Sequence, residues 1–131
     1  MNTNTGTYVA YCWAEVAGFS KFGSYTANGS VDGPFIYCGF KPRFIMIKAT
    51  SATSQWVMID TARDTFNSTS SRSIFANGVS AEETGNTAEA FDIVSNGFKL
   101  RSNGRVNVNT VTHIFMAFAE NPFGNVNGVA R

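Results

Sequence analysis

Short apolar runs separated by turn residues are the feature of this sequence that most restricts its fold. Aromatic and β-branched residues gather in these runs, and Asn-Gly pairs, Gly or Pro separate one run from the next. This composition favours β-strands. The runs that predict strands lie at residues 7–16, 35–40, 43–48, 55–60, 90–94, 98–101, 105–108 and 112–120.

The spacing within and between the runs indicates antiparallel sheets. Residues 98–101 and 105–108 alternate between apolar and polar side chains, so that one face of each strand meets a core and the other meets water. The Asn-Gly pairs at 96–97 and 103–104 predict tight hairpins. We therefore expect an all-β protein, folded as a single-domain antiparallel β-sandwich that resembles a jelly roll.

The two ends of the chain differ from its middle. Residues 1–6 and 121–131 are polar or rich in Asn and Gly, without periodicity, and we expect them to form N- and C-terminal arms on a sandwich of residues 7–120. We expect a neighbouring subunit or a larger assembly to hold these arms. One helical turn is predicted at residues 80–83, where a Ser precedes an acid by three residues.

Charge is scarce and nearly balanced in this chain. Charged residues make up 15% of it and the net charge is +1, against a usual charged fraction of about 25%. The cations Lys41, Arg43 and Lys48 are scattered and form no basic block, so we expect no nucleic-acid partner. No apolar run approaches the roughly 20 residues of a spanning helix, and nothing resembles a signal peptide. We expect no membrane partner and a neutral, polar surface.

The two cysteines, Cys12 and Cys38, both lie in predicted strands. They could form a disulfide if those strands were neighbours. A buried free thiol is the commoner state outside an oxidising compartment, and it is the state we expect.

Residues suited to catalysis are few. His113 is the single histidine and lies in an apolar run, so we expect it to be packed rather than to act as a base. Close Cys and His spacing for zinc is missing, and we expect neither a metal nor a cofactor. Asp60 and Asp64 could serve glycan hydrolysis or bind calcium. The favoured interpretation is a corner in which Arg63 bridges an acid or a carbonyl and Asp64 caps a turn. We expect no enzymatic activity.

The stretch around Pro42 predicts a break between two strands, since proline cannot donate to a sheet ladder. Beyond it the cations should alternate outward from an inner row of apolar side chains. That row is either the pair at positions 44 and 46 or the pair at 45 and 47.

Most aromatic rings occupy positions compatible with a core. The rings in or near loops, which we expect outside, are those of Tyr11, Phe22, Tyr25 and Phe66. Candidate contacts for a ligand or partner are Tyr25, Phe66, Arg63, Asp64, Lys41 and Arg43.

Four segments are distinctive: GFSKFGSYTANGS at 18–30, GPFIYCGFKPRF at 33–44, DTARD at 60–64 and SNGFKLR at 95–101. With the sequence around them, over residues 8–123, they resemble a recurrent domain of tailed-phage virion proteins. In that family the domain stands at the C-terminal end of large lectin-like tail or fibre proteins, or as a small separate protein. The resemblance carries over no catalytic residues.

The resemblance implies a bacteriophage structural protein on the virion surface, made in the host cytoplasm. We expect a head decoration or cement protein that stabilises the shell. Its partners would be other copies of itself, with a trimer as one candidate form, and a virion protein such as the major capsid protein. The alternative is a tail-fibre or tail-tip adhesin that binds host surface polysaccharide. A weaker alternative is a glycan depolymerase that uses Asp60 and Asp64.

Overall fold

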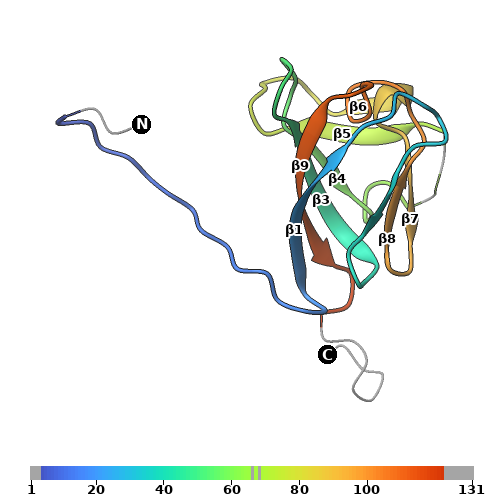
Figure 1. The fold of residues 1–131 in the computed structure, drawn as a ribbon, viewed down its shortest axis with the longest axis horizontal. Helices are drawn as coiled ribbons and strands as arrows, with labels where there is room; N and C mark the ends of the chain where they lie inside the picture. The colour runs from blue at the N-terminus through green and yellow to red at the C-terminus, as the bar shows by residue number, and fades with distance from the viewer. Residues whose placement is uncertain (1–3, 66, 68, 123–131) are drawn as a thin grey trace.

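The fold is a β-sandwich of two antiparallel sheets, and the computed structural model describes residues 4–65, 67 and 69–122 (Figure 1). Across these residues the larger sheet has six strands in the order β1-β9-β3-β4-β5-β6, and the smaller has three in the order β2-β8-β7. The predicted all-β sandwich is confirmed. Most of the predicted C-terminal arm, residues 123–131, lies outside the described residues.

The strands are short, and one turn of 3-10 helix, η1, links the sheets. Their bounds are β1 (Ser20–Thr26), β2 (Phe35–Tyr37), β3 (Pro42–Ala49), β4 (Val57–Asp60), β5 (Ser71–Phe75), β6 (Glu83–Asn86), η1 (Thr87–Glu89), β7 (Phe91–Val94), β8 (Gly97–Leu100) and β9 (Thr112–Ala119). Within the described part of the chain, no helix is long and apolar enough to cross a membrane.

The core lies between the inner faces of the two sheets. On β3 the inner row is Ile45 and Ile47, each 2% exposed, which decides between the two rows left open by the sequence. On β8 Phe98 and Leu100 are fully buried, as their alternation with polar neighbours predicts. Phe98 packs edge-on against Phe115 of β9, with ring centroids 5.6 Å apart, and so joins the two sheets.

The hairpin predicted at Asn96-Gly97 is confirmed. Gly97 pairs with Val94 across the turn between β7 and β8. A Cβ atom added at Gly97 would lie 2.1 Å from the carbonyl oxygen of Ile36 on β2. Only glycine allows β2 and β8 to approach this closely.

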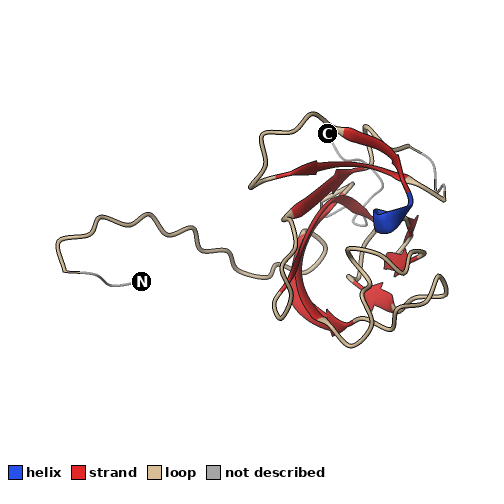
Figure 2. Cartoon of the chain, turned by 90° about the horizontal axis from the view of Figure 1, so that it is seen from above, coloured by secondary structure: helices blue, strands red, loops and turns tan. Residues whose placement is uncertain are grey.

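The strand predicted at residues 7–16 is wrong. Residues 4–16, which we call the N-terminal extension, lie exposed, and the first strand begins at Ser20. Figures 1 and 2 show the extension leaving the sandwich and running away from it. The residues have the β-propensity of a strand, but a strand also needs a neighbour to pair with. In the described residues the extension pairs with the sandwich only through an isolated bridge between Val16 and Ser20.

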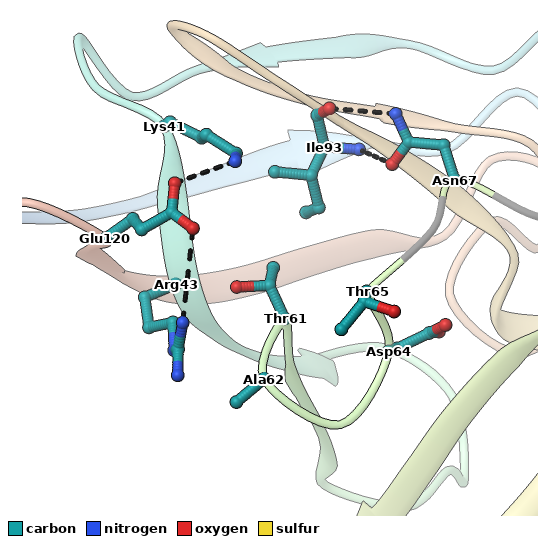
Figure 3. Close-up of a pocket in the computed structure, with 9 residues that line it drawn as sticks. All are labelled: Lys41, Arg43, Thr61, Ala62, Asp64, Thr65, Asn67, Ile93 and Glu120. Atoms are coloured by element: carbon teal, nitrogen blue, oxygen red, sulfur yellow. Dashed lines mark hydrogen bonds and ion pairs between the residues drawn. The ribbon is translucent and has the colours of Figure 1, made fainter.

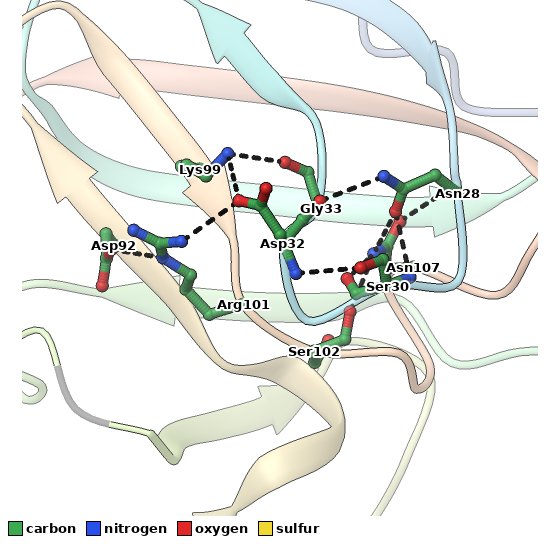
Figure 4. Close-up of polar contacts among 9 residues, drawn as sticks. All are labelled: Asn28, Ser30, Asp32, Gly33, Asp92, Lys99, Arg101, Ser102 and Asn107. Carbon is green, nitrogen blue, oxygen red and sulfur yellow. Dashed lines mark hydrogen bonds and ion pairs between the residues drawn. The ribbon is translucent and has the colours of Figure 1, made fainter.

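The strand at 105–108 and the hairpin at 103–104 are also wrong, because a side chain competes with the ladder. Asn107 is fully buried, and its Nδ2 donates to Ser30 O at 2.8 Å and Ser102 O at 2.7 Å. Its Oδ1 accepts the Asn28 N–H at 3.0 Å (Figure 4). The segment therefore folds as a turn around one amide side chain.

The helical turn predicted at 80–83 is wrong as well. Residues 80–82 form no helix, and Glu83 begins β6. The acids there form ion pairs instead, Glu82 with Arg63 and Arg72 and Glu83 with Arg105. The helical turn lies at η1, where the Asn86 side chain accepts the N–H of Ala88.

Candidate functional site

A polar hollow of about 550 Å³ opens where the start of β3 meets the corner after β4 (Figure 3). Its lining, which defines the name polar hollow below, is Lys41, Arg43, Thr61, Ala62, Asp64, Thr65, Asn67, Ile93 and Glu120. Three of the predicted contact residues, Lys41, Arg43 and Asp64, therefore surround one space.

Backbone bonds and ion pairs hold the charged side of the polar hollow. The Glu120 N–H donates to the Lys41 carbonyl at 2.9 Å, so the end of β9 is fastened beside the start of β3. Glu120 then pairs with Lys41 Nζ at 2.7 Å, and Arg43 Nη1 lies 4.0 Å from its other oxygen. Arg43 Nε lies 3.5 Å from Asp60 Oδ1. The cations of the polar hollow are thus balanced by acids, which suits a neutral polar ligand better than an anion.

The corner at residues 60–64 forms another wall, and its predicted role as a corner is confirmed. The Asp60 side chain accepts the Ala62 N–H at 2.7 Å, while the Asp60 carbonyl accepts the Asp64 N–H at 3.0 Å. The Asp64 side chain accepts the Arg72 N–H at 3.0 Å. The Asp60 carboxylate therefore caps the turn, whereas the Asp64 carboxylate ties the corner to β5, and the prediction that Asp64 caps the turn is wrong.

Two polar side chains complete the polar hollow. Asn67 bonds both backbone groups of Ile93, with its Oδ1 2.8 Å from the N–H and its Nδ2 3.0 Å from the carbonyl, so its amide is occupied. The buried Thr61 Oγ1 has no hydrogen-bond partner among the described residues. A buried hydroxyl without a partner is costly. It is therefore the wall group with the most to gain from a ligand.

Other predicted contact residues lie elsewhere. Arg63 pairs with Glu82 and does not line the polar hollow. Phe66 lies outside the described residues. The prediction that Tyr25 lies outside is wrong: it belongs to β1, and its hydroxyl donates to Val106 O at 2.7 Å. Burial raises the pKa of that hydroxyl.

The single histidine is packed, as predicted. His113 is fully buried, and its ring lies parallel to that of Tyr25 with centroids 5.1 Å apart. Its nitrogens Nδ1 and Nε2 each lie 3.2 Å from a backbone carbonyl, of Val111 and of Arg105. Burial lowers the pKa of His113 below its ordinary value despite these carbonyls.

One buried acid was not predicted from the sequence. Glu89 is fully buried at the end of η1, where Ser73 donates to its Oε2 at 2.9 Å and Arg105 lies beside its Oε1. Burial raises the pKa of the Glu89 carboxyl, against the lowering effect of Ser73 and Arg105. Arg105 also lies over the ring of Phe75, 4.7 Å from its centroid. No single-sequence pattern marks this cluster, because its members come from separate elements.

The thiols have different surroundings. Cys38 is buried, as predicted, and burial raises its pKa to about 12. Cys12 lies exposed on the N-terminal extension, so the expected burial of both thiols is wrong and the two are unpaired. Over the residues described, no group of three or more His, Cys, Asp or Glu side chains is placed to hold a metal ion.

A second candidate surface is the side of the larger sheet that faces away from the smaller one. Strand register places apolar side chains from five neighbouring strands on this side. We call it the outer face, and it consists of Phe22, Phe44, Met46, Met58, Ile74, Ile114, Met116 and Phe118, with Trp56 beside them. These residues are half-buried or exposed.

The outer face is hollowed and partly covered at one end. A hollow of about 540 Å³ lies between Trp13 of the N-terminal extension and the side chains of Phe44, Trp56 and Phe118. A second hollow of about 280 Å³ adjoins it beside Ile114. Trp13 is still 55% exposed and Ile114 41% exposed. The expected polar surface is therefore wrong for this face.

Comparison with known proteins gives one match. No curated protein and no solved structure matches the chain. A family model matches residues 1–122, a range that includes both the N-terminal extension and the sandwich. The chain belongs to the family described as domain of unknown function DUF7483.

Proposed function

We propose that this chain is a structural protein of a bacteriophage virion, most simply a decoration or cement protein on the capsid exterior. It acts by binding its neighbours and not by breaking bonds. The observation that carries the proposal is the outer face, a continuous apolar surface on a sheet whose other side already covers the core. Large exposed apolar patches mark interaction sites in soluble proteins.

The composition of the outer face supports contact with protein. Methionine and aromatic side chains are enriched at protein interfaces, and charged side chains are depleted at their centres. Met46, Met58 and Met116 lie on adjacent strands here, and flexible thioether side chains adapt to a partner surface. The Phe22 and Phe118 rings meet edge-on with centroids 6.0 Å apart, which gives the face a rigid part.

The sequence resembles domains of tailed-phage virion proteins, and this resemblance supports other virion proteins as the partners of the outer face. A small domain present in many copies stabilises a shell through repeated modest contacts, with itself and with a partner such as the major capsid protein. The chain's net charge of +1 permits close packing of copies without strong repulsion.

The test is to locate the protein on intact particles. Virions from the host that carries this gene are imaged with an antibody against the chain or with a tag fused to it. Quantitative mass spectrometry measures the number of copies per particle. We expect many copies distributed over the head. A few copies at the tail would contradict capsid decoration, and absence from the particle would contradict a virion role.

A tail adhesin that binds host polysaccharide is the second candidate, and the polar hollow favours it. Its balanced charges, and a Thr61 hydroxyl that has no partner among the described residues, suit a neutral sugar. We expect Thr61→Val and Lys41→Ala to reduce binding to host cells by about tenfold each if a sugar occupies the polar hollow. Arg63→Ala is the matched control, because Arg63 pairs with Glu82 away from the polar hollow. Equal binding by all variants would remove this candidate.

A further inference from the structure

The N-terminal extension and the outer face expose complementary apolar surfaces on the same chain. The extension carries Tyr8, Val9, Tyr11 and Trp13, which are 51%, 77%, 76% and 55% exposed. Tyr11 and Trp13 stack on one side of the extension, with ring centroids 6.1 Å apart. Exposed aromatic side chains are typical of an extended segment that becomes buried when it binds a partner.

The end of the extension already contacts the outer face within its own chain. Ser20 accepts the Val16 N–H at 3.1 Å and donates to the Ala14 carbonyl at 3.1 Å, which fastens this end to β1. Glu15 pairs with Lys21 at 2.7 Å. Trp13 is thereby held against the hollow beside Phe44 and Phe118. These bonds fix the direction in which the rest of the N-terminal extension leaves the sandwich.

The remainder of the extension does not cover its own sandwich. Figures 1 and 2 show it running away from the domain beyond this fastened end. The hollow beside Met46, Ile114 and Met116 therefore stays open within one chain. The part that could fill it, residues 7–12, runs away from its own sandwich.

We propose that the outer face of one copy is covered by the N-terminal extension of a second copy, a partner assignment that rests on the proposed function. Each copy carries one extension and one face, so exchange between identical chains satisfies both surfaces at equal stoichiometry. The extension is chemically suited to the apolar outer face, because residues 4–14 contain no charged side chain. No ion has to lose its water when they dock.

One docked extension buries less area than a standard interface, so an oligomer of this kind needs more than one such contact per copy. Residues 7–12 carry two aromatic side chains, Tyr8 and Tyr11, whose full burial removes at most about 300–500 Å² from water, at 150–250 Å² each. A standard interface buries about 800 Å² on each partner. Reciprocal or cyclic exchange gives every copy two such contacts, one through its extension and one through its face.

The first experiment measures self-association of the full chain by sedimentation velocity over a range of concentrations. We expect a closed oligomer for the wild type and a monomer after deletion of residues 1–12, a deletion that removes no described strand. Tyr11→Ser should weaken association by about 30-fold, the effect of losing an aromatic anchor. Tyr37→Ser is the matched control, since Tyr37 is 62% exposed on the other sheet.

A mixing experiment separates exchange between copies from folding back. One variant lacks residues 1–12 and keeps its outer face, while the other carries Ile114→Asp on the face and keeps its extension. We expect each to be monomeric alone and the two to associate when mixed, with circular dichroism confirming that both are folded. A wild-type monomer, an oligomer that survives truncation, or a mixture that does not associate would each overturn the inference.

The outcome is independent of the particle-location test. Association through the extension in a protein that is absent from virions would leave the inference standing and refute the proposed function. A protein that is present in virions but monomeric in solution would leave the proposed function standing and refute the inference.

Discussion

At the scale of single residues, burial decides what the polar side chains do. Tyr25 and His113 carry functional groups typical of binding or catalysis, yet both are directed at backbone carbonyls in residues 105–111, the loop before β9. Asn107 does the same for a loop of the chain. Buried polar groups without partners cost stability, so these contacts are structural requirements of the fold.

His113 should make stability fall in mild acid. Because burial lowers its folded-state pKa, its contribution is present above the ordinary value of 6.5 and is lost as the pH falls below it. The slope is at most about 1.4 kcal/mol per pH unit for one proton. Urea unfolding of the wild type and of His113→Gln between pH 7.5 and 5 checks this, and we expect the variant to be less stable but to have the shallower pH dependence.

The comparison with His113→Gln is needed because Glu89 acts in the opposite sense. Its raised pKa gives a contribution that is present at low pH and is lost as the pH rises through the folded-state value. Glu89 is unchanged in both proteins, so the difference between their curves belongs to His113. Parallel curves would show that His113 does not titrate differently on folding.

At the scale of elements, the long strands β3 and β9 determine both surfaces of the larger sheet. Their inner rows fill the core, and their outer rows form the centre of the outer face. The sequence runs FIMI and FMAF lack polar alternation, which is the pattern of strands covered on both sides. This pattern indicated an apolar outer face. We had instead expected one side of each strand to meet water.

Neighbouring residues on β3 should respond differently to truncation. Ile47→Ala removes a side chain from the core and should lower the free energy of unfolding by about 2–5 kcal/mol. Met46→Ala removes a half-exposed side chain on the outer face and should cost less than about 1 kcal/mol in dilute, dissociated protein. Urea unfolding of both variants measures the two costs. Equal costs would contradict the assignment of the two faces.

At the scale of the whole molecule, the chain has more apolar surface than one sandwich can bury. The core lies between the sheets, while most of the outer face and of the N-terminal extension remains uncovered in a single copy. Apolar surface of this kind gains stability from association. The stability of the protein should therefore depend on its concentration.

The melting temperature should rise with protein concentration. Binding that stabilises only the folded state raises it by mass action. Over about a hundredfold range of concentration, we expect a steady rise for the wild type and none after deletion of residues 1–12. Differential scanning fluorimetry measures both proteins under identical conditions. Identical, concentration-independent melting would contradict self-association.

The sequence alone determined the class of fold. Apolar runs, alternation at 98–101 and the Asn-Gly pair at 96–97 predicted the sandwich and one of its hairpins, because these are local preferences of the backbone. It also predicted the corner at 60–64 and a packed His113. It missed β1, β5 and β6, whose polar residues are paired or buried only through contacts with distant elements.

Tertiary structure decided the rest. The run at 7–16 has the composition of a strand, but among the described residues it pairs with the sandwich only through an isolated bridge at Val16, and Asn107 turned a predicted strand into a loop. Only the folded chain brings Lys41, Arg43 and Asp64 around one polar hollow and aligns five strands into the outer face. Pairing partners, shared cavities and faces are properties of residues far apart in the sequence, so no local pattern specifies them.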